Sequence, residues 1–204
     1  AVAGGSQLFV SYGQRILVWN DYRNKAIFSE ADFIIGQDRG DENFNNKGIF
    51  AGDVINYQVT TGGYLFVSAN YKIFIFRLPV TGGGSNYQPI KILRSSDNVY
   101  WKDDNAPVQF QPCGLAYDET QDALWVSDVD GYRVLRIATP LGDAKVDIVL
   151  GQPNKTSLAP NAGQGGPNRV GFGKMWSLAL DRFRNLYVVD SGYEGGGNKR
   201  ILRF

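Results

Sequence analysis

A two-part pattern that occurs four times along the chain constrains its fold more than any other feature. The first part is a leucine, an aromatic residue, a valine and a serine or valine, and it starts at positions 8, 65, 124 and 186. The second part follows a short turn and is a basic residue with bulky apolar residues after it, at 15–19, 72–76, 133–137 and 200–204. Successive copies are 57, 59 and 62 residues apart. A regular internal period of this kind indicates a repeat architecture.

Each repeat reads as four β-strands. The two parts of the pattern are the second and third strands, and the turns between them contain glycine or asparagine, which suits the positive φ of hairpin turns. Predicted first strands lie at 55–59, 114–118 and 177–181, and predicted fourth strands at 33–37, 90–93 and 146–152. Inner strands such as 124–126 are apolar on both faces, which is typical of a sheet packed between two others. Because four-stranded antiparallel units stacked around an axis form a β-propeller, we expect an all-β propeller.

The same pattern predicts the extent of each blade within a single propeller domain, 1–204. The predicted blades are 1–37, 53–93, 112–152 and 175–204. The first and last are expected to be incomplete, because Val2 lies near the end of a first strand and Phe204 ends a third strand. Since open sheet edges are templates for aggregation, we expect about 3.5 blades of a longer ring. Further blades of the same protein would cover the edges, with a second copy as the less favoured alternative.

Repeats three and four carry a resemblance to a known family. The segments 124–128 with 133–135, and 185–190 with 200–202, resemble the NHL repeat, while 36–37 and 149–153 are similar to a bacterial variant with Gly-Gln motifs and long connections between blades. The resemblance implies a propeller, usually six-bladed, whose members have diverse functions. In repeats one and two, Tyr12 and Ala69 stand where the family has aspartate.

Composition excludes several classes of function. The chain has no histidine, which rules out Ser-His-Asp and Cys-His catalysis and histidine-ligated zinc. With 21 Lys and Arg against 20 Asp and Glu, no overall field attracts nucleic acid or an anionic membrane, and no nucleic-acid partner is expected. No apolar run is long enough to span a membrane. The single cysteine, Cys113, lies in an apolar segment and is expected to be a small core residue.

An acidic and a basic residue recur at facing ends of two hairpins. These are Asp128 with Arg133, and Asp190 with Arg200. We expect each carboxylate to accept hydrogen bonds from turn amides and from the following arginine, so that the pair holds its turn in place. A catalytic role would require a cleft and a shifted pKa as well.

Alternating strand direction places the turns between second and third strands at the same end of each sheet as the connections between blades. The connections 38–52, 94–111 and 153–174 are long, and loops of that length are usually functional or disordered. Aromatic residues, which are typical of interaction surfaces, gather at this end. The candidate partner-binding residues are Tyr12, Tyr71, Tyr100, Trp101, Tyr132 and Tyr193. The alternative is that these rings pack against their own loops.

The leading functional hypothesis is a non-catalytic propeller that binds a protein or a glycan, or builds a larger assembly, through its long-loop face. No cofactor is expected. The alternative is an enzyme, because NHL-related propellers include calcium-dependent hydrolases or lyases with axial sites, here completed by blades outside this chain. Asp38, Asp41 and Glu42 are candidate calcium ligands, although they lack the spacing of an EF-hand loop.

Location follows from weaker features of the sequence. The chain does not begin with methionine, its connections are rich in glycine, asparagine and threonine, and the resemblance is to bacterial secreted repeats. These features favour an extracellular or periplasmic protein. The segment Asn154-Lys155-Thr156 also matches the acceptor pattern for N-glycosylation.

Overall fold

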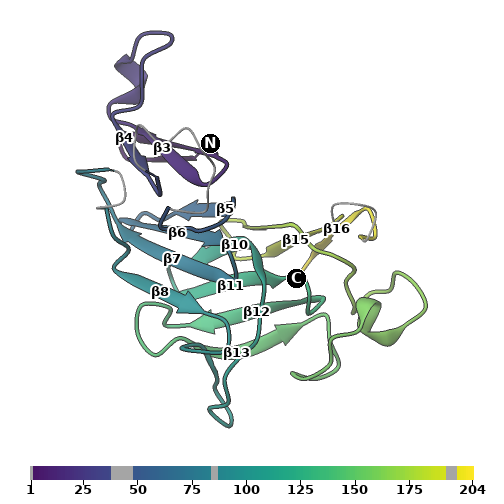
Figure 1. Cartoon of the computed structure of the whole chain (residues 1–204). Coiled ribbons are helices and arrows are strands. Elements are labelled where there is room, and N and C mark those ends of the chain that lie inside the picture. The colour runs from purple at the N-terminus through teal and green to yellow at the C-terminus, as the bar shows by residue number, and fades with distance from the viewer. Residues whose placement is uncertain (1, 38–47, 84–86, 192–196) are drawn as a thin grey trace. The chain divides into compact units, whose positions relative to one another are not determined.

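The computed structural model describes residues 2–37, 48–83, 87–191 and 197–204, which form four sheets in which consecutive strands of a blade are antiparallel (Figure 1). The first sheet is β1 (Val2–Gly4), β2 (Gln7–Tyr12), β3 (Arg15–Trp19) and β4 (Phe33–Ile35). The second is β5 (Val54–Val59), β6 (Tyr64–Ala69), β7 (Lys72–Arg77) and β8 (Lys91–Arg94). The fourth sheet is β14 (Ser177–Leu180), β15 (Leu186–Asp190) and β16 (Arg200–Arg203). Two single-turn 3₁₀ segments, η1 (Tyr22–Asn24) and η2 (Pro160–Gly163), lie in connections.

The third sheet consists of β10 (Pro112–Asp118), β11 (Ala123–Asp128), β12 (Arg133–Ala138) and β13 (Lys145–Leu150), with the short strand β9 (Tyr100–Trp101) at its edge. Figure 1 shows β10 to β13 in succession across this sheet. The predicted all-β chain is confirmed: three of the sheets contain four consecutive antiparallel strands, and the fourth contains three in the described residues. In all four sheets, the two parts of the repeated pattern form a hairpin of neighbouring strands.

Strand β9 is the main departure from the predicted elements. The sequence places 94–111 in a long connection, yet Tyr100 and Trp101 pair in parallel with Lys145 and Val146 of β13. Lys145 is the first residue of β13, so β9 lies along the outer edge of the sheet, toward the end where β13 begins. Tyr100 and Trp101 therefore form a short strand within the segment that was expected to be an unstructured connection.

The chain divides into two compact units, each with its own core. The first unit contains residues 1–70 and 74–92, and the second contains 71–73 and 93–204. In the first core, Phe50 makes edge-to-face contacts with Phe74 and Phe76, at centroid distances of 5.1 and 6.0 Å. Burying one such side chain contributes about 1.5–3 kcal/mol, so these rings contribute substantially to the core's stability.

The core of the second unit packs the third and fourth sheets against each other. Its buried members include Ala116 and Val134 from the third sheet and Leu178 and Val188 from the fourth. Strand β15 alternates buried and half-buried residues, as a strand with one core face does. In β11 every residue except Trp125 is buried, in agreement with the predicted burial of both faces.

The two Gly-Gln segments join each blade to the connection that follows it. Gly36 and Gly151 have φ values of +109° and +91°, a region that favours glycine. A Cβ on Gly36 would lie 2.8 Å from the ring of Phe50, and one on Gly151 would lie 2.1 Å from the ring of Phe172. The absence of a side chain thus lets a buried phenylalanine from the next connection pack on the backbone.

The chain enters each four-stranded sheet and leaves it at the same end, because the four strands alternate in direction. We call this end of a sheet its connection end. The hairpin turns between β2 and β3, β6 and β7, β11 and β12, and β15 and β16 lie at this end of their own sheets. Among the described residues, no helix is long and apolar enough to cross a membrane.

Candidate functional site

The ion pair between Asp128 and Arg133 organises the connection end of the third sheet. Asp128 ends β11 and Arg133 begins β12, and the two residues are direct partners across the hairpin. Arg133 Nε donates to Asp128 Oδ2 at 2.7 Å, and the residues are only 3% and 1% exposed. Burial raises the pKa of the Asp128 carboxyl above its ordinary value, against the opposing effects of Arg133 and the backbone amides of Gln111 and Gly131.

The same pair also fixes the two connections that flank the blade. Asp128 Oδ1 accepts a hydrogen bond from the backbone N–H of Gln111 at 2.8 Å. The remaining guanidinium nitrogens of Arg133 donate to the carbonyls of Gln109 and Lys155, at 2.7 and 2.6 Å. One buried pair therefore joins the hairpin to the connection before the blade and to the connection after it.

The fourth sheet repeats this arrangement. Arg200 Nε donates to Asp190 Oδ2 at 2.9 Å, and Asp190 Oδ1 accepts from the amide of Gly173, also at 2.9 Å. In both blades this amide lies 17 residues before the aspartate. Arg200 donates to the carbonyls of Asn168 and Gly171. Both predicted ion pairs are present, and the geometry is that of structural anchors for the connections.

Trp101 lies in a second contact between the two connections. Its ring centroid is 5.4 Å from the guanidinium carbon of Arg133 and 5.7 Å from Lys155 Nζ. Lys155 Nζ in turn contacts Asp103 at 2.8 Å and Asp104 at 2.5 Å. The hydrogen bonds that Lys155 donates to these two carboxylates raise the pKa of Lys155, and the one donated to Asp104 lowers the pKa of that carboxyl. Trp101 is 8% exposed, and the two cations beside its ring come from β12 and from the following connection.

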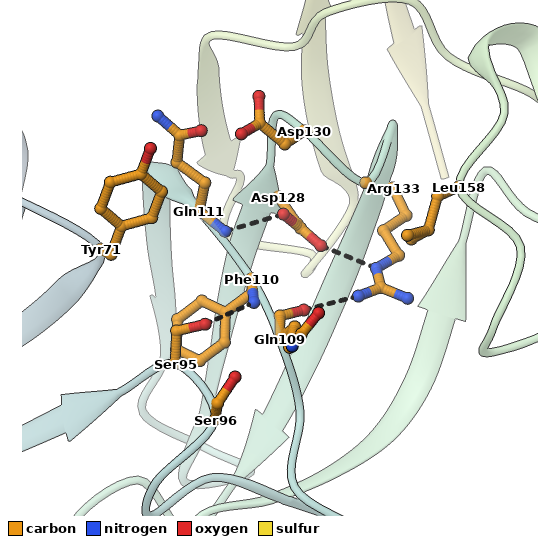
Figure 2. Close-up of a pocket in the computed structure, with 11 residues that line it drawn as sticks. Tyr71, Ser95, Ser96, Gln109, Phe110, Gln111, Asp128, Asp130, Arg133 and Leu158 are labelled. Carbon is orange, nitrogen blue, oxygen red and sulfur yellow. Dashed lines mark hydrogen bonds and ion pairs between the residues drawn. The ribbon is translucent and has the colours of Figure 1, made fainter.

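A pocket of about 290 Å³ opens beside the Asp128–Arg133 pair (Figure 2). Its lining residues are Tyr71, Ser95, Ser96, Gln109, Phe110, Gln111, Asp128, Asp130, Gly131, Arg133 and Leu158. Figure 2 shows Tyr71, Gln111 and Asp130 along one side and Leu158 on the other, next to Arg133. All of these residues belong to the second unit.

The polar side chains of the pocket differ in whether they already have hydrogen-bond partners within the protein. Asp128 and Arg133 bond to each other and to backbone groups, as described above. Asp130, by contrast, is exposed. The side-chain amide nitrogen of Gln111 faces the Asp130 carboxylate and donates to both of its oxygens. Ser95 Oγ accepts a hydrogen bond from the amide of Phe110 at 2.9 Å, and its second lone pair can accept another. The pocket thus combines one exposed carboxylate, hydroxyl groups and an aromatic ring.

The structure separates the six aromatic candidates. Tyr71 is 53% exposed and lines the pocket, and Tyr12, 62% exposed, lies in the first unit. Tyr132 is half-buried, and its carbonyl accepts a hydrogen bond from the Gln152 side chain. Tyr100 packs under Lys145 and donates its hydroxyl to the carbonyl of Asp97. Tyr193 and the candidate calcium ligands Asp38, Asp41 and Glu42 lie outside the described residues.

Several pocket residues were not singled out from the sequence. Asp130 was interpreted only as part of a turn, and Ser95, Gln111 and Leu158 belong to connections without a repeated motif. The repeat spacing could have identified Gln111, because it precedes Asp128 by the same number of residues as Gly173 precedes Asp190. That spacing marks the residue whose backbone amide binds the aspartate.

Other reactive groups are few in the part of the chain that the structure describes. No three Asp, Glu or Cys side chains in these residues converge as a metal site. Cys113 is buried, and desolvation raises the pKa of its thiol to about 11. Since the thiolate is the nucleophilic form, this cysteine is unreactive at neutral pH.

Comparisons with known proteins concern the fold. No protein-family model matches the chain, and no curated protein matches it. Among solved structures, a glutaminyl cyclase of Myxococcus xanthus aligns over 98% of this chain and 68% of its own length, with 11% identity and a TM-score of 0.52. The β-propeller domain of Cps50 (Swd1) from Myceliophteria thermophila aligns over 94% of this chain, with 14% identity and a TM-score of 0.49.

The chain spans 46% of the length of that Swd1 domain. A third structure, the extracellular domain of a putative hybrid two-component system from B. thetaiotaomicron, aligns over all of this chain but 19% of its own length, with 12% identity and a TM-score of 0.45. At these identities the likeness concerns the fold alone. The chain has the all-β fold of a β-propeller, and several of its sheets contain four consecutive antiparallel strands.

Proposed function

We propose that this chain is part of an NHL-type propeller that acts as a non-catalytic binding scaffold, with a protein or glycan partner held at the connection end of the third blade. The observation that carries the proposal is the pocket beside Asp128 and Arg133. Its walls come from the β11–β12 hairpin, from Tyr71 in the β6–β7 turn and from the connections 94–111 and 153–174, whose sequences do not repeat. The NHL resemblance would place these blades in a six-bladed ring.

The anchoring of the connections favours a binding role. Arg133 joins both of them to the hairpin, and Lys155 joins them again through Asp103 and Asp104. A surface that is held in one conformation before binding loses less conformational entropy when a partner binds. The long loops of this blade are therefore suited to recognition.

The titratable side chains of this part of the chain have structural roles, which supports binding and not catalysis. The carboxylates of Asp128 and Asp190 are buried and accept hydrogen bonds from backbone amides and from their arginines. Cys113 is held as the thiol by burial, and the sequence has no histidine. These groups stabilise the blades, and the exposed groups around the pocket are those of a recognition surface.

Binding can be tested with a displayed random-peptide library and an array of immobilised glycans. We expect ligands that bind the wild-type protein and lose about tenfold or more in affinity with Tyr71→Ala. Phe183→Ala is the matched control, because Phe183 is 70% exposed and lies in the β14–β15 turn, at the opposite end of its sheet from the connection end. Ligands that bind both variants equally, or no ligand from either collection, would contradict the proposal.

We also propose an extracellular or periplasmic location. It is supported by the residue content of the connections and by the resemblance to secreted repeats. Fractionation of cells that express the natural gene is the corresponding measurement, and recovery in the cytoplasm alone would exclude it.

A further inference from the structure

We propose that the pocket beside the Asp128–Arg133 pair receives the guanidinium group of an arginine side chain on a protein partner. The proposal rests on the binding function above. It deepens that function by committing to a protein partner and to the side chain that this partner inserts.

The first argument is the charge that the pocket leaves available. Arg133 is the one cation among the lining residues, and its nitrogens already donate to Asp128 and to two backbone carbonyls. Asp128 is 1% exposed and is paired with Arg133. Asp130 therefore presents an exposed negative charge, with the amide of Gln111 as its neighbour among the described residues. A cationic group complements this charge.

The second argument is the number and type of contacts on offer. A guanidinium has five N–H donors in a plane and stacks on aromatic rings, whereas the lysine ammonium is a compact point charge. The pocket supplies the Asp130 carboxylate and the hydroxyls of Ser95 and Ser96 as acceptors, and it supplies the exposed ring of Tyr71 for a cation–π contact. This combination matches arginine better than lysine.

The third argument is size and apolar surface. At about 290 Å³ the pocket lies at the low end for ligand sites, which suits one side chain. Leu158 is 51% exposed at the pocket wall, and Phe110, 4% exposed, is the other apolar side chain in the lining besides the ring of Tyr71. These side chains can contact the methylene stem of an inserted arginine. A neutral sugar would leave the charge of Asp130 unused, so glycan binding becomes an outcome of the test.

The test is an NMR titration of the isotope-labelled protein with acetyl-arginine methylamide and with its neutral isostere, acetyl-citrulline methylamide. We expect the arginine compound to shift the amide signals of Ser95, Ser96, Gln111 and Asp130 with a Kd of about 1 mM. The citrulline compound should bind about tenfold more weakly, because it keeps the shape and loses the charge. Asp130→Asn should weaken arginine binding by a similar factor.

Asp143→Asn is the matched control, since Asp143 is also exposed but lies in the β12–β13 turn, outside the pocket. Tyr71→Leu provides a second variant, which should weaken arginine binding by about threefold while it retains Asp130. Equal binding of citrulline and arginine, equal shifts with methyl glucoside, or no shift of the pocket signals would overturn the proposal. If library ligands without arginine bind Asp130→Asn normally and fail with Tyr71→Ala, the scaffold function stands and the arginine site does not.

Discussion

Replacing Arg133 with methionine tests whether the buried ion pair anchors the third blade. The change leaves the Asp128 carboxylate buried without its cation and removes two further hydrogen bonds, to Gln109 and Lys155. Removing one partner of a buried pair costs about 3–5 kcal/mol, because the remaining charge is desolvated and uncompensated. The methionine side chain recovers part of this by apolar burial. We therefore expect a loss of about 4 kcal/mol in the free energy of unfolding.

A second substitution separates the effect of charge from that of packing. Adding Asp128→Asn to Arg133→Met removes the uncompensated charge and keeps a polar side chain near the amide of Gln111. The double variant should therefore be more stable than Arg133→Met alone, by about 2 kcal/mol. Arg200→Met should cost less than Arg133→Met, because the carboxylate left behind, Asp190, keeps a hydrogen bond from the Asn198 side chain at 2.7 Å in addition to the one from the amide of Gly173.

The stability of Arg133→Met should also depend on pH. Burial already raises the pKa of Asp128 in the native protein, and removal of Arg133 takes away the largest opposing effect. The Asp128 carboxyl of the native variant then binds its proton more tightly than the same carboxyl in the unfolded chain. The loss in the free energy of unfolding is therefore absent at pH values below the ordinary carboxyl pKa, and it grows as the pH rises toward the raised pKa of the native state. The variant should therefore regain stability relative to wild type on acidification.

Urea unfolding followed by tryptophan fluorescence measures these effects, because Trp101 lies 5.4 Å from Arg133. The control is Lys25→Met, which breaks the Lys25–Asp32 pair of nearly equal length, 2.8 Å, whose side chains are 32% and 29% exposed. It should cost less than about 1 kcal/mol. If both substitutions cost the same, or if the double variant is less stable than Arg133→Met alone, the reasoning from burial is refuted.

Two further predictions concern Gly151 and Cys113. Gly151→Ala should destabilise the protein by about 3 kcal/mol or more, because φ is +91° and the new Cβ would lie 2.1 Å from a buried ring. Gly165→Ala, where nothing lies within 4 Å, should change the urea midpoint little, and equal effects would contradict the steric argument. Cys113 should react with a thiol reagent at pH 8 only as fast as the protein unfolds, because its pKa is about 11; rapid labelling of the native protein would contradict this.

The blades were predictable because their signals are local. Alternating side chains along a strand and a short turn between two strands involve residues close in sequence, so the hairpin that pairs Asp128 with Arg133 follows from the pattern itself. The ion pairs follow from the same register. Their further partners, the carbonyls of Gln109 and Lys155, lie in connections whose course has no repeated sequence pattern.

Strand β9 shows why the structure of the connections could not be predicted from the sequence. Tyr100 pairs with Lys145, which is 45 residues away in the chain, and two residues are too few for an alternating pattern. The sequence left open whether Trp101 is exposed or packed, and its ring packs beside two cations, one from β12 and one from the next connection. Neither cation is near Trp101 in sequence.

The sequence by itself determined the repeat, the hairpins, the Asp–Arg pairs and the exclusion of histidine chemistry, since each depends on residue identity or on neighbours along the chain. Only the tertiary structure decided which candidate aromatics are exposed and that Tyr71 and Asp130 line one pocket. The physical reason is that the pocket is formed by side chains from two hairpin turns and two connections that are far apart in the sequence. Their positions depend on hydrogen bonds and packing between segments that are distant in sequence.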